Sequence, residues 1–206
     1  MSDFWTGGPT SDGTKSLPRT SSCHALSLIA IASKAPNLIE PATPADYPAL
    51  AALAVAAYEE FAPHLPPGSW ELMRPNLCNI AERAKTTEFL VVRDDGRIVA
   101  SVGYCRPGDA DPSIFPPHMA AIMLLAVHPS ARRRGLAKRL VDACIERARR
   151  DRAPAIGLFT SEMMTSARRL YQSLGFQEDG DLPSRYGVRR IRLVLPLESR
   201  TSTSIA

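Results

Sequence analysis

The feature that most restricts the fold is an apolar run that passes directly into a turn of three arginines and a glycine. Residues 119–127, MAAIMLLAV, include no polar side chain, which is typical of a strand buried on both faces of a sheet. The segment HPSARRRGLAKRL follows at 128–140 and leads into apolar residues at helical spacing. A strand, a basic turn and an amphipathic helix in this order predict one unit of a mixed α/β sheet.

The positive charge of the chain is concentrated in this same segment. Nine basic and three acidic residues lie between 131 and 152, an excess larger than the net charge of +4 carried by the whole chain. A localised basic patch favours a polyanionic partner, either a nucleic acid or a small phosphate-rich molecule. The predicted helix should bury its apolar stripe, which consists of Leu136, Leu140, Val141, Cys144, Ile145 and Ala148.

Cap and turn signals predict the elements that precede this unit. Thr43, followed by Pro44 and then Asp46, marks the start of a helix after a short strand at 38–40. The dipeptide Asp-Gly at 95–96 separates two apolar, β-branched runs, so it predicts a β-hairpin. The elements expected after the unit are a strand at 155–160, a helix that Gly175 ends and a final strand at 188–195. Variable loops are expected at 62–79, where prolines leave room for a short helix, and at 177–187.

Composition divides the chain into three parts. Residues 1–36 are rich in Ser, Thr, Gly and Pro and are expected to form a disordered extension, residues 37–197 a folded domain, and residues 198–206 a loose tail. The apolar stretch at 25–32 is too short to cross a membrane, and its polar lead-in argues against a signal peptide. The scattered cysteines are expected to be free thiols in a reducing cytoplasm, without a zinc site: Cys23, Cys78, Cys105 and Cys144.

The arginine turn has the chemistry of an anion site. The first backbone N–H groups of a helix lack acceptors within it, and the helix dipole adds partial positive charge there. Gly135 lets a bulky group approach the backbone, and the neighbouring basic side chains strengthen the positive field. We therefore expect the turn to bind a diphosphate. The alternative is a solvated basic helix start that binds nothing.

Three segments resemble the GNAT superfamily of acetyltransferases. The segment LLAVHPSARRRGLAKRLV is similar to the family's acetyl-CoA-binding motif, R/Q-x-x-G-x-G/A, here Arg132, Gly135 and Ala137. SARRLYQSLGF, at 166–176, resembles the family's A-x-x-L-Y-x-x-x-G-F helix, and LIEPATPADYPAL resembles its first strand and helix. The resemblance implies a mixed, mainly antiparallel central sheet with two splayed parallel strands and helices on both faces.

The resemblance also implies how acetyl-CoA, as co-substrate, would lie on this chain. The pantetheine arm would occupy the gap between the strands at 119–127 and 155–160, with the diphosphate on the amides of the arginine turn. No metal is implied. The residues implied to contact acetyl-CoA are Leu125, Ala126 and Val127 on the strand, with Arg132, Arg133, Arg134, Gly135, Leu136, Ala137 and Lys138 in the turn.

Tyr171 is implied to be the acid that protonates the departing thiolate. A phenol with a pKa of about 10 is a suitable proton source for a thiolate whose acid has a pKa of about 8.5. Glu162 is the first candidate for the general base, followed by His118 and Glu60, and water-mediated deprotonation is a further route. Met164 stands where family members often have asparagine, which puts hydrogen bonding near the thioester in doubt.

These expectations lead to an acyltransferase that moves an acetyl group from acetyl-CoA to a primary amine of a small molecule or peptide. The loops would recognise the acceptor; their acids, Glu71, Glu178, Asp179 and Asp181, would suit a cationic amine. The alternatives are a CoA-binding regulatory protein without turnover and a nucleic-acid-binding module that uses the basic helix. Stacking aromatics are absent near that helix, so no nucleic acid is expected as partner. No membrane partner is expected either, and a homodimer is a candidate assembly.

Overall fold

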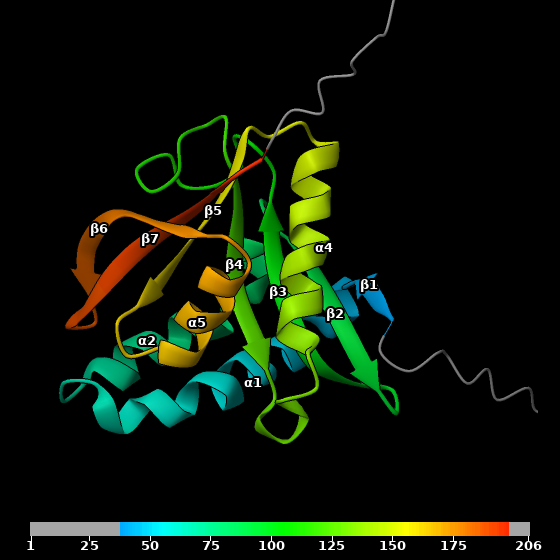
Figure 1. The fold of residues 1–206 in the computed structure, drawn as a ribbon. Coiled ribbons are helices and arrows are strands. Elements are labelled where there is room, and N and C mark those ends of the chain that lie inside the picture. The colour runs from blue at the N-terminus through cyan, green and yellow to red at the C-terminus, as the bar shows by residue number, and fades with distance from the viewer. Residues whose placement is uncertain (1–37, 198–206) are drawn as a thin grey trace, which may run out of the picture. The chain divides into compact units, whose positions relative to one another are not determined.

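The computed structural model describes residues 38–197, so the expected N-terminal extension and the C-terminal tail lie outside the described residues. The described part contains one seven-stranded sheet in the order β1-β2-β3-β4-β5-β7-β6 (Figure 1). The strands are β1 (Ile39–Pro41), β2 (Glu88–Asp94), β3 (Arg97–Cys105), β4 (Ala120–Val127), β5 (Ala155–Ser161), β6 (Gln177–Arg185) and β7 (Val188–Pro196). The helices are α1 (Tyr47–Tyr58), α2 (Ser69–Cys78), α3 (Ile80–Arg83), α4 (Leu136–Arg150) and α5 (Thr165–Ser173), with short 3-10 turns η1 (Pro44–Asp46), η2 (Glu59–His64) and η3 (Pro129–Ala131).

The two central strands run parallel and separate soon after they meet. β4 pairs with β5 only at Ala120, opposite Ile156, and at Ala121, opposite Gly157. All other neighbouring strands pair antiparallel. Beyond these two pairs β4 and β5 diverge, as Figure 1 shows. The predicted mixed, mainly antiparallel sheet with splayed central strands is confirmed.

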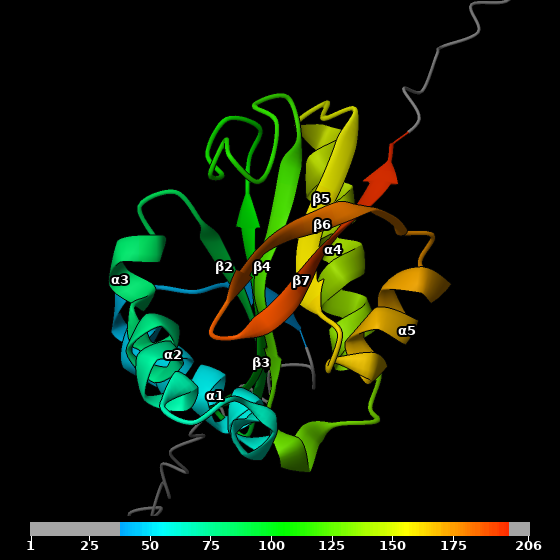
Figure 2. The ribbon, with the colours of Figure 1, turned by 90° about the vertical axis from the view of Figure 1, so that its left-hand side faces the viewer.

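Helices cover both faces of this sheet, as predicted. Figure 2 shows α1, α2 and α3 on one side and α4 and α5 on the other. Helix α4 packs on β2, β3, β4 and β5, and it buries the stripe from Leu136 to Ala148 that the sequence predicts. No helix between residues 38 and 197 has the length and apolar character needed to cross a membrane.

Two expectations about strands are corrected. Residues Ala120 to Ile122 of β4 are buried, but Met123, Leu124, Leu125 and Val127 are partly exposed, because β5 no longer covers that half of the strand. The expected loop at 177–187 is mostly strand β6. Its polar residues hide this, since an edge strand needs only backbone pairing, here with β7. The expected short helix within 62–79 is α2.

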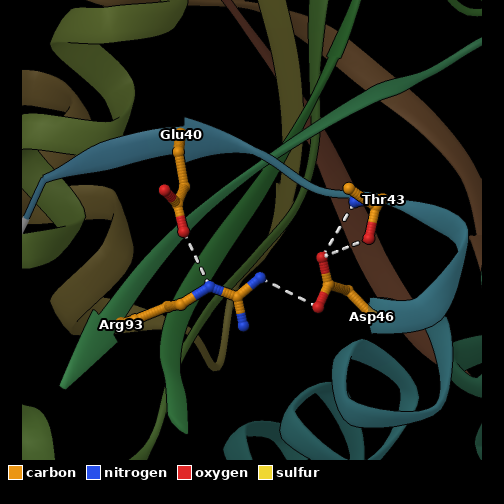
Figure 3. Close-up of polar contacts among 4 residues, drawn as sticks. All are labelled: Glu40, Thr43, Asp46 and Arg93. Carbon is orange, nitrogen blue, oxygen red and sulfur yellow. Dashed lines mark hydrogen bonds and ion pairs between the residues drawn. The ribbon is translucent and has the colours of Figure 1, made fainter. Parts of the chain in front are cut away.

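The start of the first helix is fixed to the sheet by a small polar network (Figure 3). The Asp46 carboxylate accepts hydrogen bonds from the backbone N–H and the hydroxyl of Thr43, at 2.8 and 3.0 Å. Arg93 on β2 donates to Asp46 at 2.9 Å and to Glu40 on β1 at 2.7 Å. The predicted cap at Thr43 is therefore present, and one arginine joins it to two strands.

Asp46→Asn is expected to destabilise the fold more at neutral than at acidic pH. The hydrogen bond from the Thr43 amide, followed by the one from Arg93, holds the pKa of Asp46 below its usual value of 3.8. The stabilisation is therefore present above the unfolded pKa and is lost as the pH falls through the lower folded pKa. Urea unfolding should show a loss of about 1 kcal/mol at pH 7 that shrinks toward pH 3. An equal loss at both pH values would contradict this account.

Candidate active site

The arginine turn ends in an open helix N-terminus. Helix α4 begins at Leu136, after Gly135 with a φ of 73°. Its first N–H-to-carbonyl bond runs from Arg139 to Gly135 at 3.2 Å, so the amides of Leu136, Ala137 and Lys138 have no acceptor within the helix. A Cβ built on Gly135 would meet no atom within 4 Å. An anion of the size of a phosphate can therefore reach these amides.

Most basic side chains of the turn are already paired within the protein. Arg132 forms an ion pair with Glu60 at 2.6 Å and donates to the carbonyl of Ala57 at 3.2 Å. Arg134 pairs with Asp94 at 2.7 Å, and Lys138 pairs with Asp142 at 2.8 Å. Arg133 is exposed and has a φ of 60°. These pairs connect the turn to α1, η2 and β2. The backbone amides are therefore the more direct hydrogen-bond donors to a bound anion.

A bulge interrupts β4 where the strand leaves β5. Leu124 has a φ of 47°, and the pairing with β3 shifts between Ser101 and Gly103. The Tyr58 hydroxyl donates to the carbonyl of Leu125 at 3.4 Å. Along the opposite edge of β4, Ala126 and Val127 pair with residues of β3. The β5-facing edge of β4 beyond Ala121 has no strand partner within residues 38–197, which leaves a gap of the predicted kind.

A cavity of about 140 Å³ lies on the side of this gap covered by α2 and α3. It is lined from β4 by residues 122–124, from β5 by residues 159–161, and from the turn that joins β6 to β7. Tyr58 and Phe61 close one wall, and Met164 lies in another. Sequence patterns identified neither Tyr58 nor Thr160 as a site residue, because neither belongs to a recognisable functional motif.

Two hydroxyls at the end of β5 are buried without partners. Thr160 and Ser161 are only 4% and 6% exposed, and neither side-chain oxygen has a hydrogen-bond partner. Both residues line the cavity. Buried hydroxyls in folded proteins are nearly always hydrogen-bonded. The absence of a partner within residues 38–197 therefore sets these two hydroxyls apart from the other buried polar groups of the sheet.

Tyr171 lies on α5 and is almost completely buried. Its side chain is 6% exposed and packs edge-on against Phe176, with ring centroids 5.8 Å apart. Burial, followed by the Tyr58 phenol, raises the pKa of Tyr171 well above its ordinary value. Burial also raises the pKa of Tyr58 to about 12. Both phenols are therefore neutral at physiological pH, and they lie close enough that a charge on Tyr58 would affect the pKa of Tyr171.

The three candidate bases lie in different surroundings. Glu162 is exposed and lines an open hollow of about 670 Å³, which shares Leu65, Met163 and Val188 with the smaller cavity. His118 is exposed just before β4, at the end where β4 and β5 are still paired. Glu60 is engaged in its ion pair with Arg132. Glu162 is the candidate that borders the cavity.

The cysteines in the described part are free, as expected for Cys78, Cys105 and Cys144. Cys23 lies outside that part. Burial raises the pKa of Cys105 and raises that of Cys144 to about 12, so neither is a thiolate at neutral pH. Within residues 38–197 no group of three or more His, Cys, Asp or Glu residues is arranged to hold a metal ion.

The fold is shared with solved acetyltransferase structures. A Corynebacterium glutamicum protein described as histone acetyltransferase HPA2 and related acetyltransferase is 26% identical, with a TM-score of 0.62 over 81% of this chain and 99% of that one. The ribosomal-protein-alanine N-acetyltransferase of Brucella melitensis is 24% identical, with a TM-score of 0.57 over 78% and 99%. The Salmonella typhimurium protein yncA, solved with its cofactor acetyl-CoA, is 17% identical, with a TM-score of 0.58 over 82% and 99%.

Sequence identities this low establish a shared fold, and a family model establishes the family. No curated protein matches the chain. The model described as Acetyltransferase (GNAT) family matches residues 48–176, which is more than half of the sequence. The match spans the first helix, the arginine turn and the helix that carries Tyr171. The chain therefore belongs to the GNAT family of acetyltransferases.

Proposed function

We propose that this protein transfers the acetyl group of acetyl-CoA to the primary amine of a small molecule or peptide. The observation that carries the proposal is the open N-terminus of α4 beside the gap between β4 and β5. That arrangement offers free amides for a diphosphate and an unpaired strand edge for an amide-bearing arm. The Brucella relative in the comparison is itself an N-acetyltransferase, which supports an amine as acceptor.

The residues of the site fit acetyl-CoA, which would supply an activated acetyl thioester. The amides of Leu136, Ala137 and Lys138 would hold the diphosphate, and the open space at Gly135 admits it. The backbone of Ala126 and Val127 would bind the pantetheine arm. Leu125 would also take part, with a carbonyl that already accepts one hydrogen bond from Tyr58. Thr160 and Ser161 would donate or accept at the reacting end.

The proton transfers would be divided between two groups. Tyr171 would donate its proton to the thiolate as it leaves, since the phenol is protonated at neutral pH. The pKa that burial raises makes it a weaker acid than a free phenol, so close positioning against the thiolate would have to supply the advantage. Glu162, or water in the adjoining hollow, would accept the proton that the amine loses. Holding amine and thioester side by side in a small cavity supplies the remaining acceleration through proximity.

Thr160→Val is expected to raise stability and lower activity. Valine keeps the shape but removes a buried hydroxyl that has no partner, so the free energy of unfolding should rise by about 1 kcal/mol. The loss of a hydrogen bond to the bound substrates should lower kcat/KM about fivefold. Urea unfolding and steady-state kinetics measure the two effects.

Thr87→Val is the matched control for this prediction. Thr87 is also buried, but its hydroxyl lies 3.2 Å from the Cys105 sulfur and is satisfied. That variant should lose stability and keep its activity. Unchanged activity in Thr160→Val would show that the Thr160 hydroxyl does not bind the reacting groups.

Thermal unfolding with acetyl-CoA, CoA or duplex DNA tests the proposed function. We expect both CoA forms to raise Tm and DNA to leave it unchanged, because the basic side chains of the turn are largely paired. Release of free thiol with a panel of amines then distinguishes an enzyme from a CoA-binding regulator without turnover. A fold that neither CoA form stabilises at millimolar concentration would refute the proposal.

A further inference from the structure

The cavity beside the diverging strands carries three arginines and no acid. Arg83 enters it from α3, Arg185 from the end of β6 and Arg190 from β7. No carboxylate of residues 38–197 forms an ion pair with any of the three. Asp111 stabilises the charge of Arg190, but it lies beyond ion-pair distance. The cavity is therefore a concentration of positive charge that the described protein leaves uncompensated.

The acids of the nearby hairpin are already occupied elsewhere. Asp181 pairs with Arg189 at 2.7 Å, and Asp179 pairs with Arg192 at 2.8 Å. Glu178 pairs with Arg168 at 2.6 Å. These acids do not line the cavity, so they are poorly placed to receive a cationic amine there. The charge at the acceptor end favours an anion.

The three guanidinium groups are held in place but keep free donors. Arg83 donates to the side chain of Asn76, and its Nε atom is buried without a partner. Arg190 donates through Nε to the carbonyl of Pro183 at 2.9 Å and lies 5.1 Å above the Phe159 ring. Arg185 lies 5.0 Å above the Tyr186 ring and has no hydrogen bond to the described protein. Ordered guanidinium groups with free N–H donors are suited to a carboxylate or phosphate.

The charges of the three arginines act on one another. Burial, followed by the charge of Arg185, holds the pKa of Arg83 below its usual value. The same two causes, in the same order, lower the pKa of Arg190. Like charges in a small cavity destabilise one another, and a bound anion removes that cost. The arrangement is thus more stable with an anion present than without one.

The hairpin that carries two of these arginines also closes the cavity. Its turn consists of Tyr186 and Gly187, with φ values of 56° and 72°, which is the geometry of a tight two-residue hairpin. A Cβ on Gly187 would lie 2.5 Å from Pro66, so the turn packs closely on the loop before α2 (Figure 2). This contact holds the hairpin that carries Arg185 and Arg190 against the loop before α2.

We propose that the acceptor amine carries an anionic group, a carboxylate or a phosphate, that binds Arg83, Arg185 and Arg190. The inference rests on the proposed acetyl transfer and adds its substrate class. With the anion held by the arginines, the amine of a small acceptor would face Thr160 and Ser161 at the end of β5. The preferred substrates would be amino acids or amino phosphates rather than polyamines.

Matched pairs of amines test this substrate class. The common L-amino acids are compared with their carboxamides, O-phosphoethanolamine with ethanolamine, and cadaverine serves as the cationic amine. We expect at least one free acid or the phosphate to show kcat/KM at least about tenfold above that of its neutral partner. The same compound should raise Tm in the presence of CoA, a readout that needs no turnover. A preference for amino acids over their carboxamides would identify the anion as a carboxylate. A preference for O-phosphoethanolamine over ethanolamine would identify it as a phosphate.

Arg185→Glu should abolish this preference for anionic amines and leave the binding of CoA unchanged. Arg185 is exposed and makes no hydrogen bond to the described protein, so the variant should fold, and the rise in Tm with CoA alone should persist. Arg189→Gln, on the same hairpin but paired with Asp181, should behave as the parent protein does. Equal or better use of carboxamides or cadaverine, no response to any anionic amine, or an unchanged preference in Arg185→Glu would overturn the inference. Failure of CoA itself to stabilise the protein would instead refute the proposed function.

Discussion

The variant Tyr171→Phe is expected to lower kcat about 100-fold or more while the KM for acetyl-CoA stays the same. A positioned general acid contributes factors of this size, and the phenylalanine ring preserves the edge-on contact with Phe176. The hydroxyl of Tyr171 has no hydrogen-bond partner among residues 38–197, so its removal should cost little stability. Steady-state kinetics with a saturating acceptor and thermal unfolding of the same variant check both parts.

Tyr104→Phe provides the matched control. Tyr104 is 1% exposed, and burial likewise raises its pKa, but its hydroxyl donates to Asp151 at 2.8 Å. Its removal should therefore reduce stability and leave kcat unchanged. If Tyr171→Phe lost stability while turnover was retained, Tyr171 would be a core residue with no part in proton transfer.

The strand, turn and helix from 119 to 150 could be predicted from the sequence because each of their signals is local. The apolar stripe from Leu136 to Ala148 repeats within one helix, and Gly135 supplies a positive φ at its start. The cap at Thr43 is equally local, since Asp46 lies three residues away. Short-range patterns of this kind depend little on the rest of the fold, so they survive in the structure.

The acceptor cavity could not be predicted, because its residues are brought together only by the folded sheet. Arg83, Thr160 and Arg190 come from three segments and stand in no repeating pattern. Arg185 lay in an expected loop, since the polar residues of β6 conceal an edge strand. Scattered acids on that segment would suit a cationic acceptor, but from the sequence they fit a solvated loop equally well. Their ion pairs with neighbouring arginines become visible only once β6 pairs with β7.

Gly135→Asp is expected to raise the KM for acetyl-CoA at least about tenfold with little change in kcat at saturation. Aspartate tolerates a positive φ better than most residues, and the space around Gly135 is open, so the variant should fold. Its carboxylate would stand at the mouth of the α4 amides. Two unit charges about 5 Å apart repel by about 3 kcal/mol at an effective dielectric constant of about 20, which is more than enough for a tenfold loss. Initial rates over a range of acetyl-CoA concentrations measure the effect.

Gly68→Asp separates this repulsion from any general effect of the substitution. Gly68 precedes α2 as Gly135 precedes α4, with a φ of 79° and no atom within 4 Å of a Cβ. It therefore receives the same residue in the same backbone conformation at a different helix, and its KM for acetyl-CoA should match that of the parent protein. Raising the salt concentration should recover part of the loss in Gly135→Asp, because screening weakens the repulsion. A KM that both variants raise equally, or that neither changes, would mean that the diphosphate does not bind at the start of α4.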